Sequence, residues 1–286
     1  MDSAAVLAAF DAQIRQGSHG PGAVVERADG VVRVVAGDDD WAGVTWSDLD
    51  EVTADTAIAA QIQRFAHRPG GWEWKHYSYD RPLDLAERLK AAGFVPEPTE
   101  ALMVAELSEL SGLEISGAAP STTAPAGVEI VPVTDLAGVQ SLVSVHDAVF
   151  GGDHSGLGRA LAAVLGRDGE PGGAGELGRA PVTVAAFLAV ADGLTIAAGR
   201  VELAHGTDFA SLWGGGTLEA WRGRGVFRAL VAHRAALAAA AGFRYLQVDA
   251  SADSQPILRR LGFIELAKTT PFGLAGPVGR VVLPGL

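Results

Sequence analysis

A loop in the last third of the chain carries residue types suited to binding an anion. It reads Arg222-Gly223-Arg224-Gly225-Val226-Phe227 and stands between a strand-like run and a helical pattern. Such a loop directs free backbone N–H groups and the positive end of a helix dipole at one point, and its glycines let a bulky anion approach the main chain. A pyrophosphate fits this environment. Arg222 and Arg224 would either add charge-assisted contacts or project into water.

The elements around the loop must position it. Phe209–Leu218 predicts a strand with three consecutive glycines, and the helical pattern after the loop ends at Gly242, which suits a left-handed C-cap. Tyr245–Ala250 then alternates like a strand, and Ser254–Leu261 predicts a helix closed by Gly262. The order is therefore strand, loop, helix, strand, helix and strand.

Upstream, the composition breaks at Ser108–Gly127, which we interpret as an interdomain linker because Ser, Gly, Pro, Thr and Ala replace the apolar pattern. The glycine-rich stretch Gly166–Pro181 is either a substrate-side lid or a surface loop. Between and after these stretches we expect a strand, two helices and two strands of a hairpin, at Val128–Val133, Leu136–Val149, Gly158–Leu165, Val182–Val190 and Thr195–Leu203.

In its order of elements and in two short sequences, this part of the chain resembles the GNAT N-acetyltransferase superfamily. Arg222–Phe227 is similar to the family's pyrophosphate loop, Arg/Gln-x-x-Gly-x-Gly/Ala, and Pro256–Phe263 is similar to its second motif. The resemblance covers about Val128 to Leu286. It implies acetyl-CoA, or coenzyme A, as a co-substrate held by Gly215, Gly216, Thr217, Arg222, Gly223, Arg224, Gly225, Val226, Phe227 and Asp253.

The resemblance also implies how the cofactor lies. The strand before the loop splays from its neighbour, and main-chain groups at Gly215, Gly216 and Thr217 pair with the amides of pantetheine, so that the cofactor acts like an added strand. The triple glycine by itself also fits a bulge, or tight packing against an aromatic such as Trp213.

Two positions depart from the family pattern. Phe227 stands where a small residue is expected, but its N–H is retained and phosphate binding is not excluded. Leu258 stands where many members carry a tyrosine that protonates the departing thiolate, and leucine cannot do this. A general acid contributes roughly 10²–10⁴-fold, so its loss implies a water, a slower reaction or a substitute among Ser251, Ser254 and Tyr245.

The residues expected to carry chemistry are Thr217, Ser254 and Glu202. Main-chain N–H groups near Thr217 would stabilise the oxyanion, and Ser254 would replace the missing acid. Glu202 is the candidate base, with Asp208, His205 and Glu219 as alternatives, and each of the four residues also suits a solvated side chain. His146 would face either an acceptor pocket or the core, and His233 is expected to be structural or solvated.

The N-terminal part predicts an α+β unit of its own. Ala23–Val35 has the pattern of a hairpin with an Asp-Gly turn, and Ala54–His67 has helical spacing. A strand at Trp72–Tyr77, a helix that Pro82 opens and a strand at Ala101–Leu107 follow.

This part repeats the order of the C-terminal one, since Leu89–Phe94 mirrors Leu258–Phe263. In place of the phosphate loop it carries Asp48–Thr53, an acidic run that would oppose a pyrophosphate. We therefore expect it to lack coenzyme A and to serve as scaffold, as one wall of the acceptor pocket, or as an interface.

The predicted fold class is α/β, more narrowly α+β, with two tandem GNAT-like domains that each have a mixed, mainly antiparallel central sheet flanked by helices. The expected limits are a degenerate domain at residues 1–107, a linker at 108–126 and a catalytic domain at 127–286. A chain of 286 residues with 48% hydrophobic side chains can bury two such cores.

Composition narrows the function further. The lack of cysteine excludes thiolate metal sites and a cysteine nucleophile, and a net charge of −12 disfavours nucleic acid as a partner. No signal or membrane segment is readable, so we expect a cytoplasmic location without a membrane partner, and the chemistry requires no metal. Nothing in the sequence separates a monomer from a homodimer.

These features predict an N-acyltransferase that moves an acetyl or other small acyl group from acyl-CoA directly to a primary amine of a small molecule or peptide. The alternative is a non-catalytic acyl-CoA sensor or interaction protein, which Leu258 and the missing base favour. A nucleotide-binding domain is a weaker third hypothesis because the Gly-x-x-x-x-Gly-Lys-Ser/Thr pattern is absent.

Overall fold

The computed structural model describes residues 1–17, 23–35, 41–68, 71–110, 124–165 and 182–274. By their contacts these residues form two compact units. Unit 1 contains residues 1–103, 249–255 and 265–274, and unit 2 contains residues 104–110, 124–165, 182–248 and 256–264. The last described strand, which the sequence suggested for the C-terminal domain, therefore has its contacts in the N-terminal unit. Most of the expected linker and all of Gly166–Pro181 lie outside the described residues, so the lid hypothesis stays a hypothesis.

The sheet of unit 1 has the strand order β1-β2-β3-β4-β12. The strands β1 and β2 are antiparallel, β3 and β4 are parallel, and β12 runs antiparallel to β4 with Phe272 opposite Trp74. The β1–β2 turn places Asp29 and Gly30 at φ 57° and 73°, the left-handed geometry that an Asp-Gly hairpin turn requires. The strand bounds are Val24–Ala28, Val31–Val35, Ala42–Ser47, Trp72–Tyr77 and Ile264–Leu274, and the short β5, Val95–Pro96, pairs with β12.

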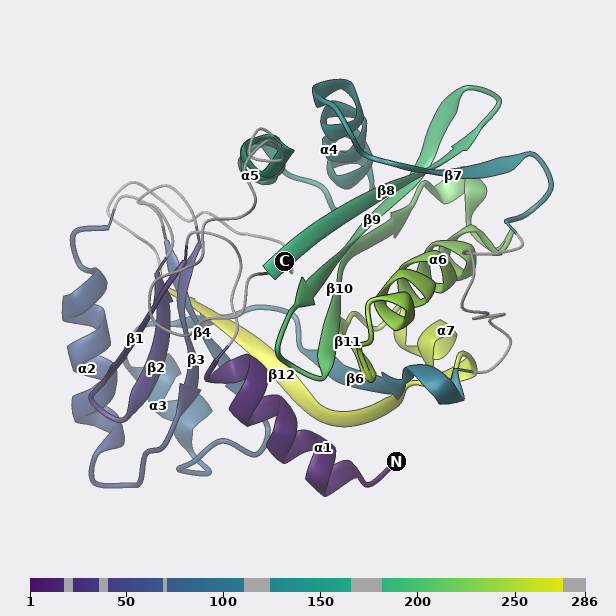
Figure 1. Ribbon diagram of the computed structural model, residues 1–286. Helices are drawn as coiled ribbons and strands as arrows, with labels where there is room; N and C mark the ends of the chain where they lie inside the picture. The colour runs from purple at the N-terminus through teal and green to yellow at the C-terminus, as the bar shows by residue number, and fades with distance from the viewer. Residues whose placement is uncertain (18–22, 36–40, 69–70, 111–123, 166–181, 275–286) are drawn as a thin grey trace. The chain divides into compact units, whose positions relative to one another are not determined.

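Helices cover both faces of this sheet (Figure 1). The helices α2 (Ala54–Phe65) and α3 (Leu85–Ala91) share one core with Trp72 and Trp74 of β4. On the opposite face, Phe10 at the end of α1 (Ser3–Phe10) packs edge-on against Tyr77, with the ring centroids 6.0 Å apart.

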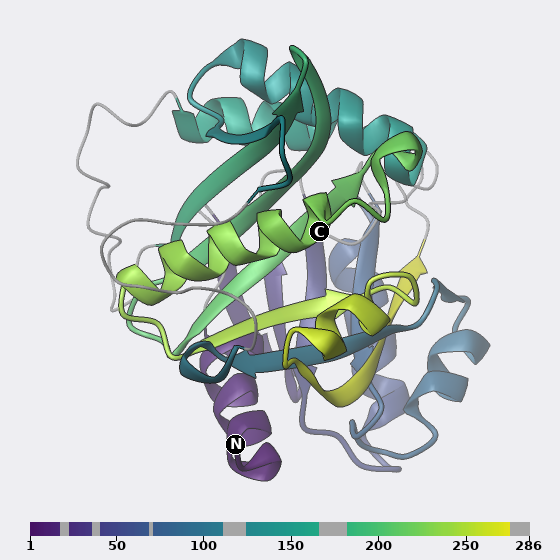
Figure 2. The same ribbon diagram turned by 90° about the vertical axis from the view of Figure 1, so that its right-hand side faces the viewer.

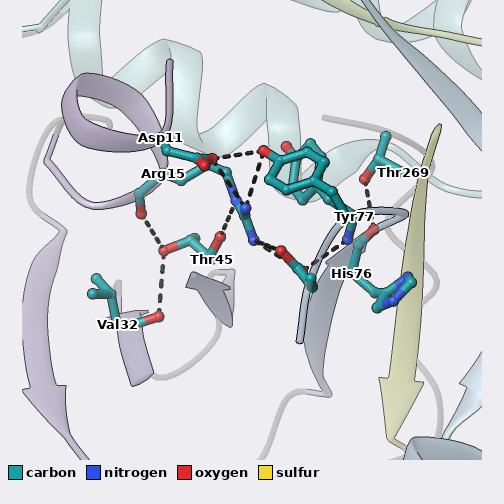
Figure 3. Close-up of polar contacts among 9 residues, drawn as sticks. Asp11, Arg15, Val32, Thr45, His76, Tyr77 and Thr269 are labelled. Carbon is teal, nitrogen blue, oxygen red and sulfur yellow. Dashed lines mark hydrogen bonds and ion pairs between the residues drawn. The ribbon is translucent and has the colours of Figure 1, made fainter. Parts of the chain in front are cut away.

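A buried arginine fixes the turn after α1, the π-helical segment Asp11–Arg15 (Figure 3). The Arg15 side chain is enclosed, and its Nη2 lies 2.9 Å from Oδ1 of Asp80 while its Nη1 lies 3.0 Å from Oδ1 of Asp11. Its Nε donates to the carbonyl of Thr45 at 2.9 Å. Because two carboxylates and a carbonyl receive the guanidinium, the charge is buried with partners, and the turn is tied to β3 and to the end of β4.

Unit 2 contains the strand order β11-β10-β9-β8-β7, antiparallel except for β10 and β11. The helices α4 and α5 cover one face, and α6 lies across the other (Figure 2). The bounds in chain order are Val128–Pro132 (β7), Leu136–Phe150 (α4), Ser155–Leu165 (α5), Val182–Ala191 (β8), Leu194–Ala204 (β9), Phe209–Thr217 (β10), Val226–Ala240 (α6), Tyr245–Ala250 (β11) and Gln255–Arg260 (α7). The strand β6, Glu100–Glu106, crosses the boundary between the two contact units, and a 3₁₀ turn, Leu107–Glu109, follows it.

The chain is thus a mixed α/β protein with a mainly antiparallel open sheet flanked by helices, as the sequence predicted. No helix in the described ranges has the length and apolar character needed to cross a bilayer.

Candidate functional site

The predicted anion loop joins β10 to α6 in unit 2. A short 3₁₀ turn, Glu219–Trp221, follows β10, and the loop then reaches the first residue of α6, Val226. Gly223 and Gly225 have φ 73° and 85°, a region that L side chains rarely adopt, so the conformation requires glycine at both positions. A Cβ atom on Gly223 would meet nothing within 4 Å, which shows that this side of the loop is open among the described residues.

The helix α6 begins without a capping side chain. Its N-cap is Gly225 and its first turn contains no acidic residue. By contrast, Asp2 caps α1 and Asp135 caps α4, where the carboxylate accepts from the N–H of Gly138 at 2.8 Å. The positive dipole end of α6 therefore has no carboxylate of its own helix against it, which suits an anion from outside the chain.

The two arginines of the loop have different settings. Arg222 is exposed and its Nε donates to the carbonyl of Thr217 at 3.1 Å, which ties the loop to the end of β10. Arg224 is exposed as well and its guanidinium carbon lies 4.7 Å from the ring centroid of Trp221. Both positive charges thus lie beside the start of α6, and their contact with phosphate stays a prediction.

The strand before the loop diverges from its parallel neighbour. It pairs with β11 only from Phe209 to Ser211, although it continues to Thr217. Near its end the N–H of Leu218 donates to the carbonyl of Ile196 on β9 at 2.9 Å. Since successive residues of a strand direct their main-chain groups to opposite edges, those of Thr217 point away from β9, toward the edge that β11 no longer covers.

The triple glycine forms a bulge in this strand. The register with β9 shifts between Trp213 and Gly216, so that Gly214 and Gly215 stand opposite a single residue, Gly199. A Cβ on Gly214 would lie 2.4 Å from Cε1 of His146, and one on Gly215 would lie 3.1 Å from the Phe227 ring.

Helices therefore pack directly on both faces of the bulge. This packing explains why glycine is needed there, and it also accounts for Phe227, whose ring fills the space above Gly215. A cofactor would pair with the main-chain edge of β10, and these contacts involve its faces instead. The bulge with tight packing and the cofactor pairing are therefore compatible explanations of the triple glycine.

A buried arginine on α6 contacts the bulge from the same side as Phe227. Arg234 is 1% exposed, and its Nη1 donates to the carbonyls of Arg200 at 3.0 Å and Trp213 at 3.4 Å, one on each strand. Burial and the nearby charge of Arg200 lower the pKa of Arg234 to about 9. No carboxylate among the described residues pairs with it, so its hydrogen bonds to the strand carbonyls compensate its burial.

A row of polar side chains crosses the α4 face of the sheet. Glu202 stands opposite Ser211, and Ser211 opposite Gln247, so the three share one face. Ser211 and Gln247 are buried, and Oε1 of Gln247 has no hydrogen-bond donor among the described residues. Glu202 is half-buried with Oε1 3.5 Å from Nε of Arg200, and burial raises its pKa despite that charge.

Two histidines lie where α4 meets this face. From the sequence, His146 was expected to face either an acceptor pocket or the core. It is 3% exposed and lies against Gly214. His154, in the turn before α5, is 6% exposed, and its ring centroid is 5.4 Å from that of His146. Sequence reasoning did not identify His154, because no motif links it to the loop.

The remaining predicted residues are spread over the structure. Ser254 is bonded to Ser251, its Oγ donating to that residue's carbonyl at 3.1 Å, and Asp253 is exposed beside it. Leu258 is 1% exposed, which makes it a core residue of unit 2. The other candidates lie elsewhere in unit 2: Glu219 and Asp208 are exposed, His205 is bonded to Thr183, Tyr245 packs on Phe209, and His233 packs on Phe187.

In unit 1 carboxylates lie at the start of the corresponding helix, α2. Oδ1 of Asp50 accepts from the Thr53 hydroxyl at 2.7 Å and from the N–H groups of Thr53 at 2.8 Å and Val52 at 3.0 Å, directly before α2. These bonds, that of the Thr53 hydroxyl first, lower the pKa of Asp50, and Asp55 lies in the first turn of the helix. A pyrophosphate at this helix start would therefore meet negative charge.

Comparison with known proteins agrees with this architecture. No protein-family model and no curated protein matches the chain. Among solved structures it is similar to a GCN5-related N-acetyltransferase from Kribbella flavida, with 18% identity, TM-score 0.61 and 96% of each chain covered. It is also similar to a tandem GNAT protein from the clavulanic acid biosynthesis pathway, with 14% identity, TM-score 0.54, and 90% of this chain and 84% of that chain covered. The chain therefore has the tandem GNAT fold.

Proposed function

We propose that this chain is an acyl-CoA-dependent N-acyltransferase with one coenzyme site, in unit 2. The observation that carries the proposal is the uncapped start of α6, which two left-handed glycines present at the end of a bulged and diverging strand. The GNAT fold of the neighbours supports an acetyltransferase role, and the expected co-substrate is acetyl-CoA or another small acyl-CoA.

In the proposed complex the pyrophosphate oxygens accept hydrogen bonds from backbone N–H groups between Gly223 and Phe227, and Arg222 and Arg224 lie beside them. The pantetheine arm extends along the exposed edge of β10, past Thr217 and toward the bulge. This placement follows from the main-chain direction of Thr217 and from the early end of the β10–β11 pairing.

The proposed chemistry is direct transfer to a neutral primary amine. The amine nitrogen attacks the thioester carbonyl, the N–H of Thr217 stabilises the oxyanion, and the C–S bond then breaks. Leu258 is buried and has no proton to give, so the thiolate must obtain its proton from another group. A small molecule or peptide with a primary amine is the proposed acceptor.

Calorimetric titration of acetyl-CoA into the wild type and into Gly225→Glu tests the site. The added carboxylate would lie at the start of α6, where its negative charge repels the pyrophosphate, and it should abolish binding. Gly242→Glu is the matched control, because Gly242 lies beyond the other end of the same helix, also with φ 85° and with open space around its Cβ position. Equal binding by both variants, or no binding by the wild type, would remove the proposed site.

The sensor hypothesis keeps one specific observation in its favour, the leucine at position 258. A sensor would bind acetyl-CoA through the same loop but would release no free thiol with any amine. Incubation of the wild type with acetyl-CoA and a panel of small amines and peptides, followed by detection of free coenzyme A, separates the two functions.

A further inference from the structure

Two buried imidazoles and one carboxylate form a linked group beside the β10 bulge. His146 on α4 lies against Gly214, and His154 in the turn before α5 lies against His146 with the ring planes 89° apart. Asp147, the residue after His146, faces His154. The group therefore connects the bulge to the α4–α5 turn within unit 2.

Asp147 fixes the orientation of His154. Its Oδ1 accepts from the backbone N–H of His154 at 2.9 Å and lies 2.8 Å from the imidazole Nδ1. These bonds hold the pKa of Asp147 below its usual value, so the carboxylate is ionised and accepts the Nδ1 proton. In the neutral ring, Nε2 then carries the lone pair, which is the arrangement of a carboxylate-supported base.

Both Nε2 atoms are buried and have no hydrogen-bond partner among the described residues. A buried acceptor of this kind is normally satisfied by ordered water. The two imidazoles lie edge to face with their centroids 5.4 Å apart, and they supply two of the partners that such a water needs. The pair thus forms a polar position directly behind the bulge, shielded from bulk solvent.

The charges around the two rings differ. His146 faces Arg200 of β9 as well as His154, and burial together with the Arg200 charge lowers its pKa to about 4 despite Asp147. His154 faces the carboxylate of Asp147, with Asp153 next to it in the chain. The ring of His154 therefore has a carboxylate as its charged neighbour, whereas the ring of His146 has a cation.

We propose that His154, oriented by Asp147, accepts the proton of the attacking amine through a water held jointly with His146. The inference rests on the proposed acyltransferase function and names its proton acceptor. As the C–N bond forms, the N–H proton passes to the water, and a proton of the water passes to Nε2 of His154. When the C–S bond breaks, the imidazolium returns this proton through the same water to the thiolate sulfur, so the cycle needs no tyrosine at position 258.

Glu202 is the competing base on the same face. Burial raises the pKa of Glu202, but its Oε1 lies 3.5 Å from Nε of Arg200, and the charge of that arginine opposes part of this rise. No comparable cation pairs with His154 among the described residues. The dyad therefore suits proton transfer better than the glutamate that the sequence suggested.

The experiment measures acyl transfer against pH with a reactive amine, together with acetyl-CoA affinity by calorimetry. We expect His154→Gln to lower kcat by about 10²-fold or more at unchanged affinity for acetyl-CoA. Asp147→Asn should lower kcat at unchanged affinity for acetyl-CoA, because Nδ1 of His154 loses the carboxylate that orients the ring, and Asp147→Glu should restore part of kcat. A merely structural role for Asp147 would change affinity or stability, and Asp147→Glu would then not restore kcat.

Glu202→Gln and His233→Gln complete the test. His233 lies on α6 and packs on Phe187, so His233→Gln should retain wild-type kcat. Wild-type kcat in His154→Gln, or the large loss in Glu202→Gln instead, would overturn the inference while leaving the acyltransferase function intact. A wild type that binds acetyl-CoA but transfers no acyl group would refute both.

Discussion

The burial of His146 predicts that unit 2 loses stability in mild acid. Because burial lowers the pKa of His146 from about 6.5 to about 4, the unfolded chain takes up this proton at a higher pH than the folded chain. The contribution is therefore fully present above pH 6.5 and is lost as the pH falls toward 4. For these two values the loss between pH 7 and pH 5 is about 2 kcal/mol.

Urea unfolding at pH 7 and pH 5, followed by circular dichroism, measures this loss. The variant His146→Gln has no imidazole to protonate, so its free energy of unfolding should fall by about 2 kcal/mol less than that of the wild type over the same interval. Carboxylates and His76, whose pKa burial also lowers to about 4, titrate in both proteins and cancel in the difference. Equal pH dependence in the two proteins would refute the argument that His146 is neutral and enclosed.

Three further perturbations test the packing. Gly214→Ala should cost at least about 2 kcal/mol more than Gly223→Ala in thermal unfolding, because its Cβ would lie 2.4 Å from a histidine ring whereas that of Gly223 meets open space. Asp80→Ala should destabilise the protein by about 3–5 kcal/mol, because it leaves a buried guanidinium short of its main partner. Burial raises the pKa of Glu100 to about 7, and the charge of Lys75 opposes that rise. Without this charge the pKa of Glu100 in the folded protein is higher still, so the free energy of unfolding of Lys75→Met should fall more than that of the wild type between pH 6 and pH 8.

Local patterns predicted the elements of this fold well where they depend on neighbours in sequence. The strand Trp72–Tyr77 and the strand Tyr245–Ala250 have the predicted bounds. The Asp29-Gly30 turn is left-handed, as an Asp-Gly hairpin turn requires, and so is Asp192-Gly193 between β8 and β9. The helix expected to open at Pro82 begins three residues later, at Leu85, because the residues between form turns. Gly242, predicted as a left-handed C-cap, follows α6 with φ 85°.

Contacts between residues that are far apart in the sequence could not be predicted from local patterns. The pairing of β12 with β4 joins residues nearly two hundred positions apart, and no local pattern of β12 names its partner. Asp147 and His154 are seven positions apart, and they meet only because the turn between α4 and α5 folds back. The sequence of that turn does not predict this conformation. Arg234 did leave a signal, since a charged residue in the apolar stripe of a helix indicates a buried cation.

The two units differ at the step that decides cofactor binding. Each contains a parallel strand–helix–strand element, β3–α2–β4 in unit 1 and β10–α6–β11 in unit 2. Before α2 the carboxylate of Asp50 accepts from the N–H groups of Val52 and Thr53, and Asp55 lies in the first turn of the helix, whereas α6 has glycine at its N-cap and no acidic residue in its first turn. An anion therefore meets negative charge at one site and none at the other, so the titration of acetyl-CoA should saturate at one molecule per chain. Two equivalents per chain would mean that a pyrophosphate displaces the carboxylate of Asp50. In that case the charge before the helix would not decide which unit binds the cofactor.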